Sequence, residues 1–186
     1  MVRAVSRILA TALAAAALPT ASPAAGGDPA LRAKIFGAFA HVKSYRLTVL
    51  GAARSLGVWV APNTYQMTTE LGGKPVKTVI IGSDYWTLAD GKWEHSGRVS
   101  SNLDVDIAGL LRNAKRDANA GFARLPDQTQ DGKRVGTFGY TFANGTEETC
   151  NYDRATYRVT RCKADEVTVL YADYNDPGNR VANPRK

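Results

Sequence analysis

The chain has 186 residues, of which 44% are hydrophobic and 22% are charged, and its formal net charge is +7. A length of this order suits one domain, and the composition is that of an ordinary globular protein. The basic residues are scattered, with no Lys/Arg run longer than two. They therefore indicate a solvated surface and argue against nucleic acid as a partner.

The first 25 residues have the pattern of a secretory signal peptide. Arg3 and Arg7 precede an apolar stretch from Ile8 to Leu18, and small residues follow it. That stretch is shorter than the roughly 20 residues that cross a bilayer, although a short uncleaved anchor is the alternative. Cleavage leaves 22 basic and 17 acidic residues, a net charge of +5. We expect residues 26–186 to form one exported domain, with weak attraction to anionic lipid headgroups as a minor possibility.

Residues 28–42 predict a helix. Asp28 can cap it and Pro29 suits its first turn. Its apolar side chains recur at three- and four-residue spacing and form one stripe, made of Leu31, Ile35, Phe36 and Phe39. A short helix with such a stripe must pack on another element.

From Ser44 to Gly97 the apolar period changes to two, which predicts strands. Three residue pairs separate the alternating runs: Gly72-Gly73, Gly82-Ser83 and Asp90-Gly91. Such pairs are typical of hairpin turns. This block is predicted to be an antiparallel meander, with a further interruption at Pro62-Asn63.

Residues 101–118 predict a second helix, with Ser101 and Asp104 at capping-box spacing. Residues 121–129 read as a looser connection. A second block of alternating strands is expected from Lys133 onward, with a hairpin turn at Asn144-Gly145. The most economical arrangement is an α+β fold in which two or more amphipathic helices pack in the concave face of a single, strongly curved antiparallel sheet. That face either leaves a cavity for an apolar ligand or is filled by a dry core.

Cys150 and Cys162 are the only cysteines. If residues 153–157 contain a tight turn, the two cysteines face each other across adjacent strands, and an oxidising compartment permits a disulfide. Two free thiols are the next alternative. A metal site is the weakest, because His41 and His95 are the only histidines and soft ligands are therefore few. We predict the disulfide, no metal and no cofactor.

One stretch carries a family resemblance. The sequence GVWVAPNTYQM at residues 57–67 resembles the pattern G-x-L-W-V-x-x-P-N-x-F of the periplasmic lipoprotein carrier LolA and its relatives, the LolA/LppX-type superfamily. The stretch TVIIGSDYWTLADGKW at residues 78–93 looks like that family's next hairpin, and the order of the predicted elements also matches. The resemblance implies an unclosed β-barrel whose helices form a lid over a hollow that holds acyl chains of a lipoprotein or another lipid.

The resemblance also implies site residues. The predicted cavity lining consists of Leu47, Val49, Trp59, Tyr65, Met67, Val79, Ile81, Trp86, Phe138, Tyr140, Phe142 and Val169. The predicted lid contacts are Leu31, Ile35, Phe39, Ile107, Leu110 and Leu111. Met67 is the strongest single candidate, because a flexible methionine adapts to variable acyl chains. Ala61 stands where the lipoprotein carrier has a basic latch residue, and this departure puts the particular lipoprotein cargo in question.

The expected function is therefore that of a monomeric periplasmic carrier of lipid or lipoprotein acyl chains, which exchanges them with donor and acceptor proteins in the inner and outer membranes. An envelope sensor or partner-binding protein with the same fold is the alternative. An enzyme is not expected, since the sequence shows no nucleophile motif and its two histidines suit surface positions. The ending DYNDPGN places Asp173, Asn175 and Gly178 like calcium-loop residues. Pro184 nevertheless stands where a bidentate glutamate is needed, so this segment is expected to close the fold along the rim.

Overall fold

The computed structural model describes residues 27–98, 121–141 and 145–185. These residues form one helix, α2 (Pro29–Ala40), and one sheet of eleven strands. The strands are β1 (Ser44–Leu50), β2 (Ser55–Val60), β3 (Thr64–Leu71), β4 (Lys74–Ile81), β5 (Asp84–Ala89), β6 (Lys92–Arg98), β7 (Gly121–Gln130), β8 (Lys133–Thr141), β9 (Glu147–Tyr152), β10 (Val159–Ala164) and β11 (Val167–Ala172).

The first helix forms where its capping signals predict it. The Asp28 carboxylate accepts a hydrogen bond from the Leu31 backbone N–H at 2.8 Å, and Pro29 occupies the first turn. The buried side chains of α2 are Leu31, Ile35 and Phe39, which are three of the predicted lid contacts. The other three, Ile107, Leu110 and Leu111, belong to the second predicted helix and lie outside the described residues.

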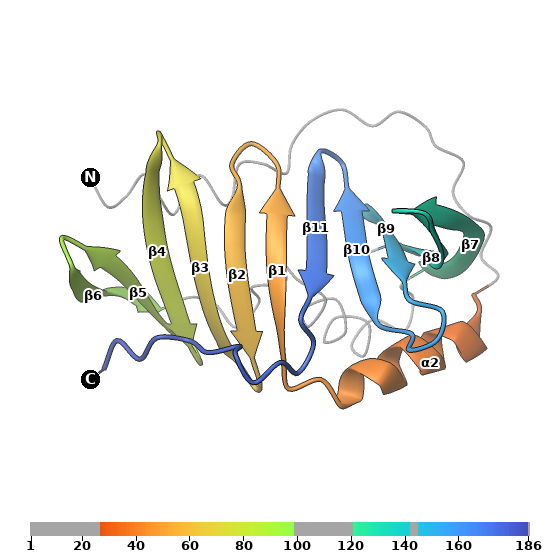
Figure 1. Cartoon of the computed structure of the whole chain (residues 1–186), viewed down its shortest axis with the longest axis horizontal. Helices are drawn as coiled ribbons and strands as arrows, with labels where there is room; N and C mark the ends of the chain where they lie inside the picture. Colours follow the sequence, from red (N-terminus) through yellow and green to blue (C-terminus); the bar gives the residue numbers. More distant parts are fainter. Residues whose placement is uncertain (1–26, 99–120, 142–144, 186) are drawn as a thin grey trace.

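The sheet is built from two antiparallel meanders. Its spatial order is β6-β5-β4-β3-β2-β1-β11-β10-β9-β8-β7, so the first and last strands pair at its centre (Figure 1). β11, the last strand in the chain, therefore lies in the middle of the sheet. The two edges are β6 and β7, which stand at opposite ends of the order and leave the barrel open.

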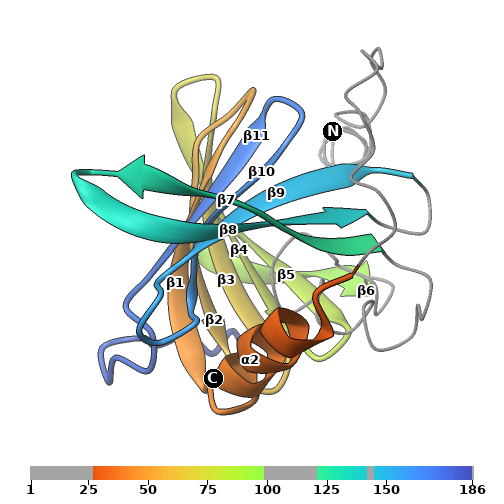
Figure 2. The ribbon, with the colours of Figure 1, turned by 90° about the vertical axis from the view of Figure 1, so that its right-hand side faces the viewer.

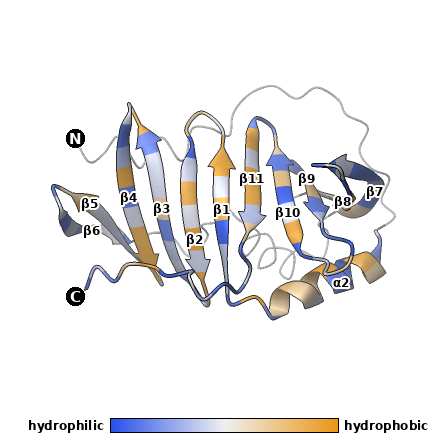
Figure 3. Cartoon of the chain, in the orientation of Figure 1, coloured by the Kyte–Doolittle hydropathy of each residue, from blue (hydrophilic) through white to orange (hydrophobic). Residues whose placement is uncertain are grey.

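The sheet is strongly curved. Viewed from the β7 end, β7 and β8 run in a clearly different direction from β1 to β4, and α2 lies across one end of the sheet (Figure 2). Hydropathy alternates along strands such as β1, β10 and β11 (Figure 3), as expected for strands with unlike faces. The prediction of one strongly curved, unclosed antiparallel sheet is confirmed, with a single helix in the part of the chain that the structure describes.

Residues 121–130 form an edge strand instead of the predicted loose connection. Pro126 within this strand cannot donate to a sheet ladder. On β7 it falls where the pairing with β8 shifts register, between Leu125 and Gln128. An edge strand with a bulge tolerates proline, and Phe122 anchors this strand in the core.

The segment after β11 is fastened to the start of β1. The Asn175 side chain accepts hydrogen bonds from the backbone N–H groups of Lys43 at 2.6 Å and Ser44 at 3.3 Å. The nearly buried Asn179 donates to the Ser44 hydroxyl at 3.0 Å and to the Asp173 carbonyl at 2.6 Å, and it accepts from Arg46 Nε at 3.1 Å. These polar residues therefore have a structural role, because they hold the segment after β11 against β1.

Residues 173–185, which we call the C-terminal strap, then cross the sheet toward β5 (Figure 1). The Ala182 N–H donates to the Gln66 side chain at 2.9 Å. Arg185 pairs with Asp84 at 2.6 Å and lies 5.0 Å above the Trp86 ring. The strap thus runs along the lower ends of the strands in Figure 1, as expected for a segment at the rim, and covers Trp86 on the sheet face that points away from α2.

Candidate functional site

The concave face of the sheet, which packs against α2, carries a continuous row of paired residues. Cys162 pairs with both Cys150 and Val169, and Val169 pairs with Val49 on β1. The row runs from β7 to β4 through Arg124, Phe138, Cys150, Cys162, Val169, Val49, Ser55, Thr69 and Val76. Directly paired residues project to the same side of a sheet, so this row defines the face.

Most of the predicted cavity lining lies on this face. The register places there Leu47, Val49, Trp59, Tyr65, Met67, Phe138, Tyr140 and Val169. These residues belong to, or pack against, one core cluster that also contains Leu31, Ile35 and Phe39 of α2. Phe142 lies outside the described residues. That the eight residues contact a ligand remains a prediction.

Val79, Ile81 and Trp86 lie on the opposite, convex face, which corrects their predicted place in the lining. The two-residue turn at Gly72-Gly73 pairs the odd-numbered Tyr65 and Met67 with the even-numbered Ile80 and Thr78. Val79 and Trp86 pair with each other. Trp86 contacts the strap residue Arg185 and the His95 ring, so these side chains belong to a second apolar layer beneath the strap.

α2 seals one end of the concave face with aromatic contacts. Phe39 meets the Tyr45 ring at 5.8 Å on β1, and Phe36 meets the Phe122 ring at 6.3 Å on β7. On the same face the apolar side chains Val49, Met67 and Ile80 are only partly buried. The concave face therefore keeps some apolar surface that its core contacts do not cover.

Gly57 explains part of the sequence motif. A Cβ atom at this position would lie 2.5 Å from Met67 Sδ and 3.0 Å from Leu47 Cγ. Glycine therefore lets both side chains lie over β2. Beside it, the Trp59 indole N–H is buried and has no hydrogen-bond partner among the described residues, which leaves one polar donor on an apolar surface.

The predicted disulfide is confirmed. Cys150 and Cys162 pair directly across β9 and β10, with an S–S distance of 2.03 Å, and both are almost completely buried on the concave face. The turn between the strands is held by Asp153, whose carboxylate accepts hydrogen bonds from the Ala155 N–H at 3.0 Å and the Thr156 N–H at 2.7 Å.

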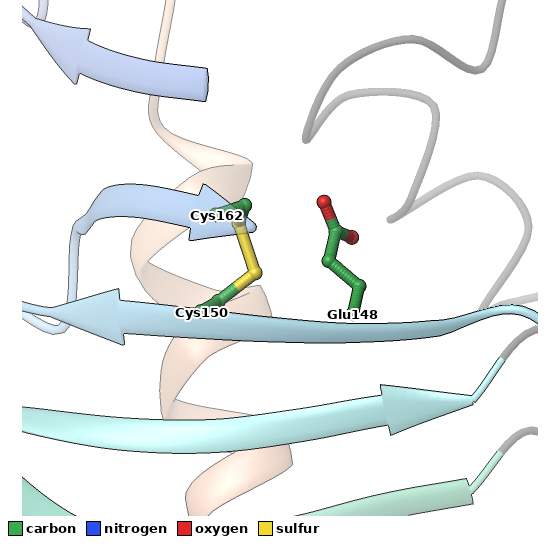
Figure 4. Close-up of side chains that lie close together, drawn as sticks. All are labelled: Glu148, Cys150 and Cys162. Carbon is green, nitrogen blue, oxygen red and sulfur yellow. A yellow bond between two sulfur atoms is a disulfide. The ribbon is translucent and has the colours of Figure 1, made fainter. Parts of the chain in front are cut away.

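Glu148 is a candidate site residue that the sequence analysis missed. It follows the same alternation as Cys150, it pairs with Tyr140, and its carboxyl group extends from β9 on the side of the disulfide (Figure 4). Burial raises the pKa of Glu148 from its ordinary 4.5 to about 7. Among the described residues none hydrogen-bonds to this carboxyl, so it is an ionisable group in an apolar setting.

The Glu148 carboxylate and the two cysteine sulfurs have ligand atoms within 4.8 Å of one another. That grouping resembles a metal site only in composition. Metal binding by cysteine requires thiolates, and both sulfurs are here engaged in the disulfide. The arrangement is thus an apolar surface with one titratable group.

The two histidines lie on separate parts of the fold. His41 caps the C-terminal end of α2, whereas His95 lies on β6 with its Nε2 3.8 Å from Asp84.

Among the described residues no helix has the length and apolar composition needed to cross a membrane.

Comparison with solved structures places this architecture in a known fold. The lipoprotein LppX of Mycobacterium tuberculosis matches with a TM-score of 0.60 over 82% of this chain and 99% of its own, at 15% sequence identity. LprF of Mycobacterium bovis matches with a TM-score of 0.57 over 85% of this chain and 98% of its own, at 11% identity. The chain thus has the LolA/LppX-type fold that its sequence resembles, in a divergent form. No family model and no curated protein matches the sequence.

Proposed function

We propose that this protein binds the acyl chains of a lipid or lipid-modified protein on its concave face and carries them through an aqueous envelope compartment. The observation that carries the proposal is the apolar row across β8 to β1, which α2 covers at one end and beside which Val49, Met67 and Ile80 are only partly buried. The LppX-like fold supports it.

The physical need for such a carrier follows from the cost of exposing hydrocarbon to water, about 0.8 kcal/mol for each CH₂ group. A concave apolar face removes that cost during transfer. Release then requires an acceptor membrane or protein that offers the chain a similar environment. Met67 suits this role because its unbranched side chain adapts to different chain shapes, and Gly57 leaves room beneath it.

The cellular setting is part of the proposal. Residues 1–25 are taken as a signal peptide that directs residues 26–186, as one lipid-binding domain, to the periplasm. The disulfide suits an oxidising compartment. Donor and acceptor proteins in the two membranes are the proposed partners.

The proposal is tested by mass spectrometry of organic extracts from protein purified from its native envelope, together with uptake of a fluorescent fatty acid. We expect co-purified lipid and saturable uptake. Met67→Asp should reduce uptake more than tenfold, because it places a charge on the concave face. Recovery of no lipid combined with no uptake would refute the carrier proposal.

A matched control lies one residue away. Thr68 projects to the convex face, where it pairs with Leu56 and Lys77. Thr68→Asp adds the same charge to the same strand and should leave uptake within twofold of the unmodified protein. Equal losses in both variants would mean that the concave face is not where the chain binds.

A further inference from the structure

A polar pocket lies where the start of α2 meets β7, β9 and the turn after β9. It encloses about 170 Å³ and is lined by Asp28, Ala30, Leu31, Lys34, Arg124, Tyr152, Arg154 and Tyr157. Leu31 and Tyr152 also belong to the apolar core cluster. The pocket therefore shares a wall with the interior that α2 seals.

Basic groups dominate the pocket. Lys34, Arg124 and Arg154 come from three separate segments of the chain. Asp127 lies outside the lining and compensates Arg154, whose Nη1 is 3.3 Å from its carboxylate. Within the described part of the chain, no carboxylate forms an ion pair with Lys34 or Arg124, and the three basic side chains outnumber Asp28, the one acid in the lining.

The acid in the lining is already engaged. Asp28 accepts the hydrogen bond from the Leu31 N–H that caps α2, so its position serves the helix. Lys34 Nζ donates to the Tyr157 hydroxyl at 3.1 Å and lies 5.0 Å above that ring. The Tyr157 ring in turn stacks on Tyr152 at 5.8 Å. The lysine is thus held over the pocket by a platform of two tyrosines.

Arg124 links this pocket to the concave face. It pairs with Phe138 in the concave row, which continues to Cys150 and the disulfide. With a charged residue at the edge of an apolar face, the hydrocarbon part of a lipid can bind the face while its polar headgroup binds the charged residue. Arginine is well suited to the second role because its planar guanidinium binds phosphate oxygens in pairs.

We propose that this pocket binds a phosphate group, with Arg124 and Lys34 as its principal ligands. In its fuller form the inference rests on the proposed function: the phosphate then belongs to the headgroup of a lipid whose acyl chains lie on the concave face. Free phosphate is the other source of the same chemistry. The Tyr152 hydroxyl, which also lines the pocket, can assist as a hydrogen-bond donor.

The test compares two lipids that share acyl chains and differ in headgroup, dioleoylphosphatidylglycerol and dioleoylglycerol, each offered in micelles of an uncharged detergent. Lipid retained by the purified protein is quantified by mass spectrometry. We expect about tenfold tighter binding of the phosphate-bearing lipid. The double variant Lys34→Gln/Arg124→Gln should bring the two lipids within twofold and leave dioleoylglycerol binding unchanged.

Lys92→Gln is the matched control. Lys92 is an exposed lysine on β6, at the far end of the sheet from the pocket, and its neutralisation should leave the tenfold preference intact. A preference that survives in the double variant, or that Lys92→Gln removes equally, overturns the proposal.

Inorganic phosphate titrated by calorimetry separates the two sources. Phosphate binding that the double variant abolishes, with neither lipid retained, supports the pocket as a site for free phosphate and refutes lipid carriage. Equal retention of both lipids, unaffected by the double variant and with no phosphate binding, supports carriage and overturns the phosphate site.

Discussion

Replacing Glu148 with glutamine should make the protein less sensitive to pH. The carboxyl lies on the concave face beside the disulfide, and burial raises its pKa to about 7 from an ordinary 4.5. Each unit of pKa difference corresponds to about 1.36 kcal/mol between the two protonation states. The ionised carboxylate therefore lowers the free energy of unfolding by about 3 kcal/mol at alkaline pH.

The sign follows from which state holds the proton. Between pH 4.5 and about 7 the folded protein keeps the Glu148 proton and the unfolded chain loses it, so folding stability falls as pH rises through this window. Below the window Glu148 is neutral in both states, and Glu148→Gln should match the unmodified protein. At pH 8 the variant should be more stable by about 3 kcal/mol.

The assay is urea unfolding, with the disulfide intact, at half-unit steps from pH 4 to pH 8. The difference between variant and unmodified protein isolates Glu148 from every other titrating group. Glu147→Gln supplies the control, because Glu147 pairs with Thr141 on the opposite face of the strand and is exposed. A stability difference for Glu148→Gln that stays constant with pH, or grows toward acid, would refute the reasoning.

Three further changes test the scaffold by chemical denaturation. Asn179→Ala removes one hydrogen-bond acceptor and two donors that fasten the strap to β1, and should cost about 2 kcal/mol; a cost below 0.5 kcal/mol would show that the strap is not fastened there. Cys150→Ala/Cys162→Ala opens a short loop and should cost roughly 3 kcal/mol at most, whereas a gain in stability would mean that the disulfide strains the concave face. Asp153→Ala removes the acceptor of the hairpin turn and should cost about 1 kcal/mol. Hydrogen bonds from Thr156 lower the Asp153 pKa, so its contribution should persist above pH 4 and be lost in acid; an equal contribution at pH 2 would contradict this account.

The sequence predicts most of the described elements, with β7 as an exception, but it does not predict which face of the sheet every strand residue occupies. Capping chemistry at Asp28 and Pro29 places α2 correctly, and strict alternation identifies β1. The predicted sheet face is wrong for Val79 and Ile81 on β4. These residues are apolar, but apolar character alone does not show on which face of the sheet a side chain lies, whereas the length of the preceding turn does. A two-residue turn after Leu71 fixes the register, and counting through it would have placed Val79 on the convex face.

Other errors came from tertiary context. Trp86 lies on the convex face, where the strap residue Arg185 covers it. The alternation of residues within β5 cannot predict this contact, because Arg185 is about a hundred residues farther along the chain. An acidic pair such as Glu147 and Glu148 usually lies on the surface, whereas burial of Glu148 raises its pKa to about 7. Its alternation with Cys150 was the available signal. Phosphate-pocket residues from α2, β7 and the turn after β9 are brought together only by the fold.

The pairing of β1 with β11 has a consequence for how the chain reaches its native state. The seam between the two meanders joins the first strand of the sheet to the last, so 126 positions in the sequence separate Arg46 from its partner Ala172. Until the final strand is available, β1 presents a bare edge, which is the kind of surface that invites aggregation. Pairing of such distant segments also slows folding. A polypeptide organised in this way completes its sheet only once β11 has been made, and a variant that lacks residues 167–186 should therefore lose the centre of the sheet and not one of its edges.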